Sequence, residues 1–151
     1  MRTLPEIQET AIRLNDGQKV KVSLNPKLKY ADGRCDVLTG AIDLHPAYLD
    51  EDSASDQHLQ AALLHELGHA HDPLYFWPWI TMLAAVVVWA VLVAYAMVAH
   101  TQDAVLAGVA VFGVVFAVFL YYMKDRESRA DAWARARMPD FDAYKNLTDE
   151  D

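Results

Sequence analysis

The chain has 151 residues, which is room for one domain, and it combines a 54% hydrophobic content with a net charge of −8. Apolar and charged residues must therefore be segregated along the chain. The acidic balance and the sparse basic residues exclude a typical nucleic-acid-binding protein. The single cysteine, Cys35, excludes an intrachain disulfide and agrees with a reducing compartment.

The N-terminal part has the pattern of a small antiparallel sheet. Residues 12–15 and 18–22 alternate apolar and polar side chains, and the intervening Asp16-Gly17 is typical of a two-residue hairpin turn. Residues 40–44 form a third candidate strand, ahead of the next helical segment. Together with the helices that follow, these strands predict an α+β fold.

The sequence HELGH at residues 65–69 matches the pattern HExxH and lies within a predicted amphipathic helix. Residues 53–56 have capping-box spacing, and apolar residues then recur at helical intervals. Positions i and i+4 share one helix face, so the imidazoles of His65 and His69 can both reach one metal ion. Glu66 is then placed to take a proton from a water molecule at the metal. The alternative is a helix with ordinary surface or core histidines and a solvated glutamate; the helical context favours metal binding.

Two long apolar segments follow this helix. Residues 80–99 and 104–123 contain no charged side chain, and at a rise of about 1.5 Å per residue each can cross a hydrocarbon core of about 30 Å. Aromatic residues at the ends that face the soluble parts are typical of a membrane interface. The alternative, a pair of core helices in a soluble protein, fits poorly because so short a chain has little other mass to cover them. We predict a transmembrane hairpin with a short turn at residues 100–103.

The distribution of basic residues predicts the orientation of this hairpin. Lys and Arg are absent between Arg34 and Lys124, whereas several follow the second apolar segment. The positive-inside rule places residues 124–151 in the cytoplasm. An even number of spans places residues 1–76 there as well, with the hairpin at residues 77–123 between the two parts. Both termini and the HExxH helix are therefore expected on the cytoplasmic side.

A third metal ligand is expected after the hairpin, because a catalytic zinc usually has three protein ligands and one open position. The segment RESRAD at residues 126–131 places Glu127 and Asp131 four positions apart, on one helix face. Glu127 would complete a His-His-Glu site, and Asp131 would orient a ligand imidazole through its other ring nitrogen. The alternative is an ordinary charged helix face, in which neighbouring arginines pair with these acids. Spacing alone leaves both interpretations open.

The order of HELGH, two spans and RESRADAWA resembles the membrane-embedded gluzincin zinc metallopeptidases, a family that includes HtpX and the CAAX prenyl protease. The resemblance covers about residues 36–135. HtpX-like proteins carry further spans before HExxH, so this chain would be a minimal member. The resemblance also implies that the strand at residues 40–44 is a sheet edge that pairs with an extended substrate; an ordinary half-buried strand is the alternative.

By position, the resemblance implies a role for each site residue. His65, His69 and Glu127 would bind one Zn²⁺ per chain. Glu66 would be the general base, and Asp131 would accept a hydrogen bond from the ring nitrogen of a ligand imidazole that does not bind the metal. The metallopeptidase domain would then consist of the small sheet, the HExxH helix and the third-ligand helix, with the two-helix transmembrane hairpin inserted before the last of these.

We therefore predict a membrane-anchored zinc metalloendopeptidase whose substrates are polypeptides or membrane proteins near the cytoplasmic membrane surface. The alternative is a non-catalytic zinc-binding adaptor or sensor, in which a fourth protein ligand such as His58 or Cys35 closes the site. A gluzincin of the sensor-transducer type is a third interpretation. A donor for the oxyanion formed during hydrolysis is also expected, and its candidates are Arg129, Arg135 and Tyr144.

Overall fold

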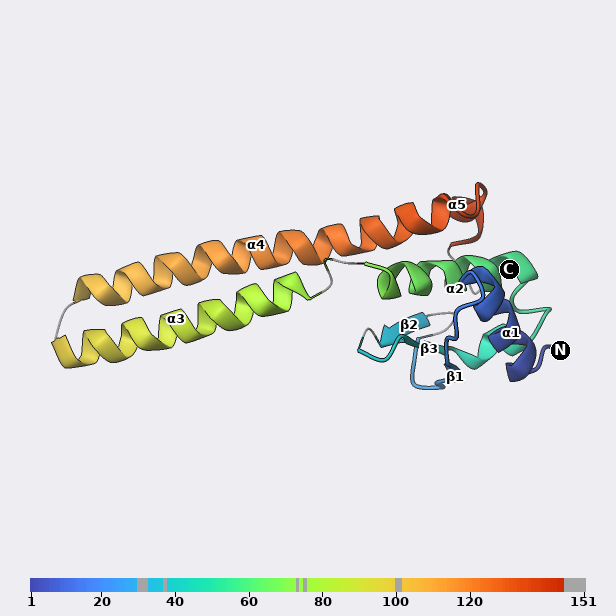
Figure 1. Cartoon of the computed structure of the whole chain (residues 1–151), viewed down its shortest axis with the longest axis horizontal. Coiled ribbons are helices and arrows are strands. Elements are labelled where there is room, and N and C mark those ends of the chain that lie inside the picture. Colours follow the sequence, from blue (N-terminus) through green and yellow to red (C-terminus); the bar gives the residue numbers. More distant parts are fainter. Residues whose placement is uncertain (30–32, 37, 73, 75, 100–101, 146–151) are drawn as a thin grey trace. The chain divides into compact units, whose positions relative to one another are not determined.

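The structure is a computed structural model that describes residues 1–29, 33–36, 38–72, 74, 76–99 and 102–145. The chain divides into two compact units, one comprising residues 1–72 and 128–151 and the other residues 73–127. The elements in chain order are helix α1 (Leu4–Leu14), strands β1 (Val22–Leu24), β2 (Gly33–Asp36) and β3 (Ala41–Leu44), the 3₁₀ helix η1 (Pro46–Leu49), and helices α2 (Asp56–Ala70), α3 (Trp77–Ala99), α4 (Gln102–Arg135) and α5 (Phe141–Tyr144) (Figure 1). The predicted α+β class is confirmed.

The chain begins with a helix, α1, where the first strand of a hairpin was expected. Thr3 and Glu6 form a capping box, in which the Glu6 carboxylate accepts hydrogen bonds from the backbone N–H and the hydroxyl of Thr3 at 2.7 and 2.9 Å. Ile7 and Ala11 lie one turn apart and are fully buried. The predicted strand at residues 12–15 is therefore wrong, because the helical pattern set up by this cap continues through it.

Asp16 and Gly17 do form a tight turn, but the turn ends a helix. Both residues have positive φ, 53° and 79°, and the N–H of Gly17 donates to the carbonyl of Ile12 at 2.9 Å. The chain is extended only later, and β1 begins at Val22, the last residue of the predicted strand 18–22.

The sheet has three strands in the order β1-β3-β2 and is mixed. β1 pairs with β3 in parallel, with Val22 opposite Ile42, whereas β2 pairs with β3 antiparallel, with Cys35 opposite Ile42. The prediction of an antiparallel sheet is wrong because β1 follows a helix instead of closing a hairpin. The third predicted strand is present as β3, but both of its sides are paired. It is therefore the central strand, and the expected substrate-pairing edge does not lie there.

Helix α2 packs on the sheet and on α1 (Figure 1). It begins after Ser55, whose hydroxyl accepts a hydrogen bond from the backbone N–H of His58 at 3.3 Å. This cap lies two residues later than the predicted start at Ser53. The shared core consists of buried apolar residues from α1, β1, β3, η1 and α2, among them Ile7, Ala11, Val22, Ile42, Leu44, Tyr48, Leu59, Leu63 and Leu67.

A second buried face of α2 contacts the C-terminal part of α4. Ala61 and Leu64 pack with Ala134 and with Phe141 of α5. One helical turn further along α2, a Cβ atom added to Gly68 would lie 2.7 Å from the carbonyl oxygen of Ala130 and 2.8 Å from its Cα. Only glycine permits this distance, so the two helix backbones meet directly at this point.

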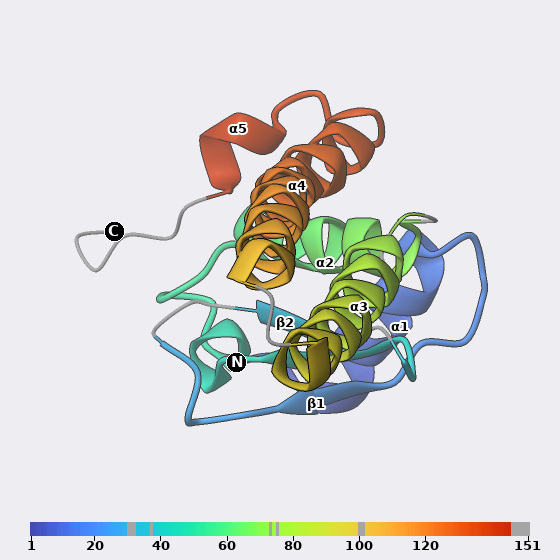
Figure 2. The ribbon, with the colours of Figure 1, turned by 90° about the vertical axis from the view of Figure 1, so that its left-hand side faces the viewer.

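The second unit is a helical hairpin of α3 and the first part of α4. The two helices run side by side in both views (Figures 1 and 2). Aromatic pairs join them, with ring centroids 6.2 Å apart for Trp89 and Phe112 and 5.6 Å apart for Trp79 and Phe119. Gly108 of α4 lies against Leu92 of α3, where an added Cβ would meet the Leu92 Cβ at 3.5 Å.

Both helices of this hairpin are long and apolar enough to cross a membrane. The candidate segments are Trp77–Ala96 and Val105–Arg135, and the most apolar 18-residue stretch of each has a mean hydropathy of 2.2 and 2.4, respectively. The two apolar helices predicted at residues 80–99 and 104–123 are therefore present. Part of the predicted turn, residues 100–101, lies outside the described residues.

Candidate metal centre

His65 and His69 lie one turn apart on α2, on the side that carries Ala61 and Gly68 and contacts α4. Their ring centroids are 4.7 Å apart, and the rings are nearly perpendicular at 83°. His69 is buried, with 4% of its surface exposed, and His65 is half-buried. The helical spacing of HExxH thus places two imidazoles together against the neighbouring helix.

Glu127 approaches these histidines from α4. Helical phase puts it on the stripe of Ala130 and Ala134, three and seven positions further along, which are fully buried. One ring nitrogen from each of His65 and His69 and one carboxylate oxygen of Glu127 all lie within 4.8 Å of one another. Glu127 itself is exposed. The group could hold a metal ion.

The donor set fits a zinc ion. Ligand atoms around a tetrahedral zinc lie about 2.1 Å from the ion, and hence about 3.4 Å from one another. A largest separation of 4.8 Å therefore requires only small side-chain rotations before all three atoms contact one ion. Two imidazoles and one carboxylate are also a donor combination found in catalytic zinc sites.

Asp131 hydrogen-bonds to the first histidine of the motif. Its Oδ1 lies 2.9 Å from Nδ1 of His65, and its side chain is 11% exposed. An ionised carboxylate can only accept, so Nδ1 of His65 carries the hydrogen and donates it. Nε2 is then left with its lone pair, which is the state that a metal ligand needs.

Two cations neutralise the other oxygen of Asp131. Lys145 forms an ion pair with Oδ2, and Nη2 of Arg135 lies 3.8 Å from it. Lys145 directly follows α5, which is anchored by the fully buried Phe141. Arg135 is held in turn by Asp142 of α5, with two nitrogen–oxygen distances of 2.8 Å. The short C-terminal helix therefore supports the carboxylate behind His65.

Glu66 points toward the sheet and is buried, with 6% of its surface exposed. Its carboxylate occupies the space beside Gly33, the first residue of β2. A Cβ atom added to Gly33 would lie 2.7 Å from Oε1 of Glu66 and 2.9 Å from its Cγ. The absence of a side chain at Gly33 therefore allows the carboxylate to lie against the start of β2.

The three candidates for an oxyanion donor have other contacts. Arg129 forms an ion pair with Asp72, and Arg135 forms one with Asp142. The ring of Tyr144 lies edge-on to that of His58, with centroids 5.3 Å apart. These contacts do not identify any of the three as the hydrogen-bond donor to the oxyanion.

The two candidates for a fourth protein ligand have other positions in the fold. Nδ1 of His58 is 2.9 Å from the hydroxyl of Ser55, the residue that caps α2. Cys35 is buried in β2, opposite Ile42. Neither belongs to the group of ligand atoms that the described residues bring together. The described residues thus bring together three possible ligand atoms.

Two residues beside the centre carry no clear sequence signal. Gly33 lies in the segment Gly33–Asp36, which lacks the apolar alternation of a strand and is extended because it pairs with β3. Lys145 contacts Asp131 only because the chain turns back after α4 and packs Phe141 onto α2. Both contacts depend on tertiary packing, so no spacing rule could have predicted them.

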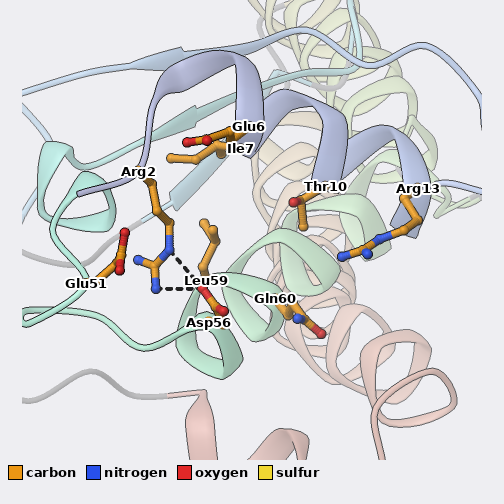
Figure 3. A pocket seen from close by; sticks show the side chains of 9 residues that line it. All are labelled: Arg2, Glu6, Ile7, Thr10, Arg13, Glu51, Asp56, Leu59 and Gln60. Carbon is orange, nitrogen blue, oxygen red and sulfur yellow. Dashed lines mark hydrogen bonds and ion pairs between the residues drawn. The ribbon is translucent and has the colours of Figure 1, made fainter.

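A separate polar cavity of about 280 Å³ lies between α1 and the start of α2 (Figure 3). Arg2 lies at one side of it, with its Nη2 2.8 Å from Oδ1 of Asp56. The same guanidinium donates to the carbonyls of Tyr48 and Ala54 at 3.1 and 2.6 Å. Arg2 therefore ties the N-terminus to the start of α2, and the cavity contains none of the candidate metal ligands.

Comparisons of the chain with models of protein families, with curated proteins and with solved structures found no match. The interpretation of the centre therefore rests on its residues and their geometry.

Proposed function

We propose that the protein is a membrane-anchored zinc metalloendopeptidase that hydrolyses peptide bonds near the cytoplasmic membrane surface. The observation that carries the proposal is the approach of ligand atoms from His65, His69 and Glu127 to within 4.8 Å of one another. HExxH by itself predicts two ligands, whereas the third comes from a segment beyond the apolar hairpin. The resemblance of these segments to membrane-embedded gluzincins points to the same activity.

The geometry favours a catalytic site over a structural one. Structural zinc sites usually have four protein ligands, and catalytic sites keep one position open. When bound, zinc would polarise the carbonyl of the scissile peptide and lower the pKa of a water molecule beside it. Asp131 contributes by holding His65 in the tautomer that presents Nε2.

Glu66 is the proposed general base. It directly follows the ligand His65 in sequence, and its buried carboxylate is shielded from bulk water. Glu66 takes a proton from the attacking water as the oxygen bonds to the carbonyl carbon. It then delivers that proton to the amine that leaves when the C–N bond breaks. The products are a carboxylate and an amine.

Strand β2 is the proposed substrate-binding edge. It is an outer strand of the sheet, and within the described residues no strand pairs with its side opposite β3. Its first residue, Gly33, lies against the carboxylate of Glu66. An extended peptide that pairs with β2 through main-chain hydrogen bonds would therefore pass the general base. This mode of binding selects an extended polypeptide and makes weak demands on its sequence.

The exposed surfaces of α3 and α4 support a membrane anchor. In the most apolar 18-residue stretch of each helix, only 11% and 6% of the stretch is buried. The core helices of a soluble protein would be mostly covered. Lipid is the solvent that suits such a surface. The basic residues that follow the second span, beginning with Lys124, place the centre on the cytoplasmic side by the positive-inside rule.

Substitution of Glu66→Gln in the purified full chain tests the proposed function. We expect zinc to remain bound and cleavage of an unfolded polypeptide to fall by at least about 100-fold, because the general base is lost. Glu9→Gln, the same change at an exposed position of α1, is the control and should leave cleavage unchanged. Cleavage that survives Glu66→Gln would contradict the proposal. A wild-type protein that binds zinc but cleaves no polypeptide would support the adaptor or sensor alternative.

A further inference from the structure

A partly buried ion pair lies beside the candidate centre and has no part in the chemistry proposed above. Nε of Arg129 is 3.2 Å from both carboxylate oxygens of Asp72, and Nη2 is 2.8 Å from Oδ2. The Asp72 side chain is 2% exposed and that of Arg129 is 24% exposed. A two-pronged contact of this kind fixes direction as well as distance, because the guanidinium is a rigid planar fork.

Asp72 is attached to the end of the HExxH helix. α2 ends at Ala70, and the backbone N–H of Asp72 donates to the carbonyl of His69 at 3.3 Å. The residue whose carboxylate Arg129 binds is thus hydrogen-bonded through its own backbone to a candidate metal ligand.

Three contacts between α2 and α4 occur in opposite order along the two helices. Asp72 meets Arg129, Gly68 meets Ala130, and His65 meets Asp131. The helices therefore run antiparallel where they touch. Among these three contacts, the one made by Arg129 is the nearest in sequence to Glu127.

The same three contacts control the rotation of α4 about its axis. Successive residues of a helix point about 100° apart, so Arg129 and Asp131 flank Ala130 on opposite sides. Gly68 sets the distance between the backbones at Ala130. A helix held on both flanks of its contact line cannot roll in either direction without breaking a polar contact. The ion pair supplies one of these two restraints.

We propose that Arg129, through its ion pair with Asp72, is a positioning residue for the third metal ligand. It fixes the rotation of α4 about its own axis and the position of α4 along α2, so that Glu127 faces His65 and His69. This inference rests on the proposed function, because it assumes that Glu127 binds the metal. It assigns Arg129 to the assembly of the site and not to the oxyanion of the reaction.

Arg129→Lys is the variant that tests this role most directly. Lysine keeps the positive charge beside the buried Asp72 but loses the fork that fixes direction. We expect zinc affinity, measured by competition with a chelator, to fall about 10-fold or more, as for other residues that orient metal ligands. The visible absorption of the Co²⁺-substituted protein should change as well, because it reports the number and geometry of the ligands.

Arg137→Lys is the matched control. Arg137 lies two residues after the end of α4 and also pairs with a carboxylate, Asp16 at 3.6 Å, but this partner is 76% exposed and lies on the turn after α1. The control should leave zinc affinity and the cobalt spectrum unchanged. The melting temperature of the metal-free protein provides a second readout. Arg129→Lys should lower it more than the control does, because its ion pair is less exposed, but a residue that only stabilises the fold would leave the cobalt spectrum of the folded variant unchanged.

The double variant Asp72→Asn/Arg129→Gln removes both charges, so that no unpaired charge is buried, and it is the second test if Arg129→Lys fails to fold. Wild-type zinc affinity and an unchanged cobalt spectrum in either folded variant would overturn the inference. Loss of the fold in both variants would also overturn it, since the pair would then serve the fold as a whole. Glu127→Gln separates this failure from that of the proposed function: if it leaves zinc affinity unchanged, the third ligand is wrong, whatever Arg129 does.

Discussion

Oδ1 of Asp131 lies 2.9 Å from Nδ1 of His65, so a carboxylate on α4 orients the first histidine of a motif that lies on α2. The two residues are far apart in sequence, with the whole apolar hairpin between them. Asp131 lies four positions after Glu127, and its contact would determine which nitrogen of His65 is available to a metal.

Asp131→Asn should weaken zinc binding without removing a ligand. The amide can still meet the ring of His65 but cannot supply the negative charge, and we expect zinc affinity to fall by about 10- to 100-fold. Competition with a chelator measures it. Asp16→Asn is the control, because Asp16 is an exposed acid on the turn after α1 and pairs with Arg137 instead of a residue of the centre. Equal affinities for the two variants would mean that the contact between Asp131 and His65 has no role at the metal.

Gly33→Ala should impair catalysis and spare the metal. The new Cβ would lie 2.7 Å from Oε1 of Glu66 and must displace the carboxylate. The backbone of Gly33 does not have positive φ, so alanine causes no strain of its own. We expect a lower kcat with zinc content and melting temperature close to those of the wild type.

Cleavage at the wild-type rate in Gly33→Ala would show that Glu66 does not need its observed position beside β2. A loss of zinc in parallel with activity would instead show that the substitution distorts α2. Measuring zinc content and kcat on the same preparation separates the two results.

Gly68→Ala should push α2 and α4 apart. The added methyl would lie 2.7 Å from a backbone oxygen and 2.8 Å from a backbone carbon of Ala130, atoms that can move only with their helix. Overpacking of this kind typically costs about 1–3 kcal/mol, and zinc affinity should fall with it. Gly113→Ala is the matched control in the interior of α4, where an added Cβ meets nothing within 4 Å. The control should keep the wild-type free energy of unfolding, measured by denaturation, and the wild-type zinc affinity, measured by competition with a chelator.

The capping box of α1 predicts a pH dependence. Hydrogen bonds from the backbone N–H and then from the hydroxyl of Thr3 lower the pKa of the Glu6 carboxyl below its ordinary value of 4.5. A carboxyl with a lowered pKa in the folded state stabilises the fold above its unfolded-state pKa, and the contribution is lost as the pH falls through the folded-state value. The melting temperatures of the wild type and Glu6→Gln should therefore differ near neutral pH and converge in acid. A difference that is independent of pH would contradict this explanation.

The local patterns of the sequence predicted the α+β class and the two apolar helices, which are confirmed. Helical spacing placed His65 and His69 on one face of a helix and Glu127 and Asp131 on one face of another, but it left open whether Glu127 binds a metal. Spacing could not show that α2 and α4 touch. That contact requires Gly68 opposite Ala130, and glycine in a helix is by itself no sign of a close approach.

The sequence interpretation failed where short patterns competed. The alternation at residues 12–15 is brief, whereas the cap formed by Thr3 and Glu6 and the buried pair Ile7 and Ala11 support a helix through the same residues. Once the first hairpin strand is helical, β1 cannot pair as predicted, and the sheet becomes mixed. The strand predicted to be the substrate-pairing edge, residues 40–44, is therefore central, and β2 lies at an edge instead. The residues of β2 show no strand pattern of their own.

Zinc reconstitution tests the central claim most directly. Metal should be removed from the purified full chain with a chelator, and cleavage of an unfolded polypeptide should then be measured as zinc is added back. The metal-free protein should be inactive, and activity should rise linearly and stop at about one zinc per chain, as a single catalytic site requires. Glu127→Gln should show no such end point. Cleavage that persists in the metal-free protein, or that no amount of zinc restores, would contradict the account.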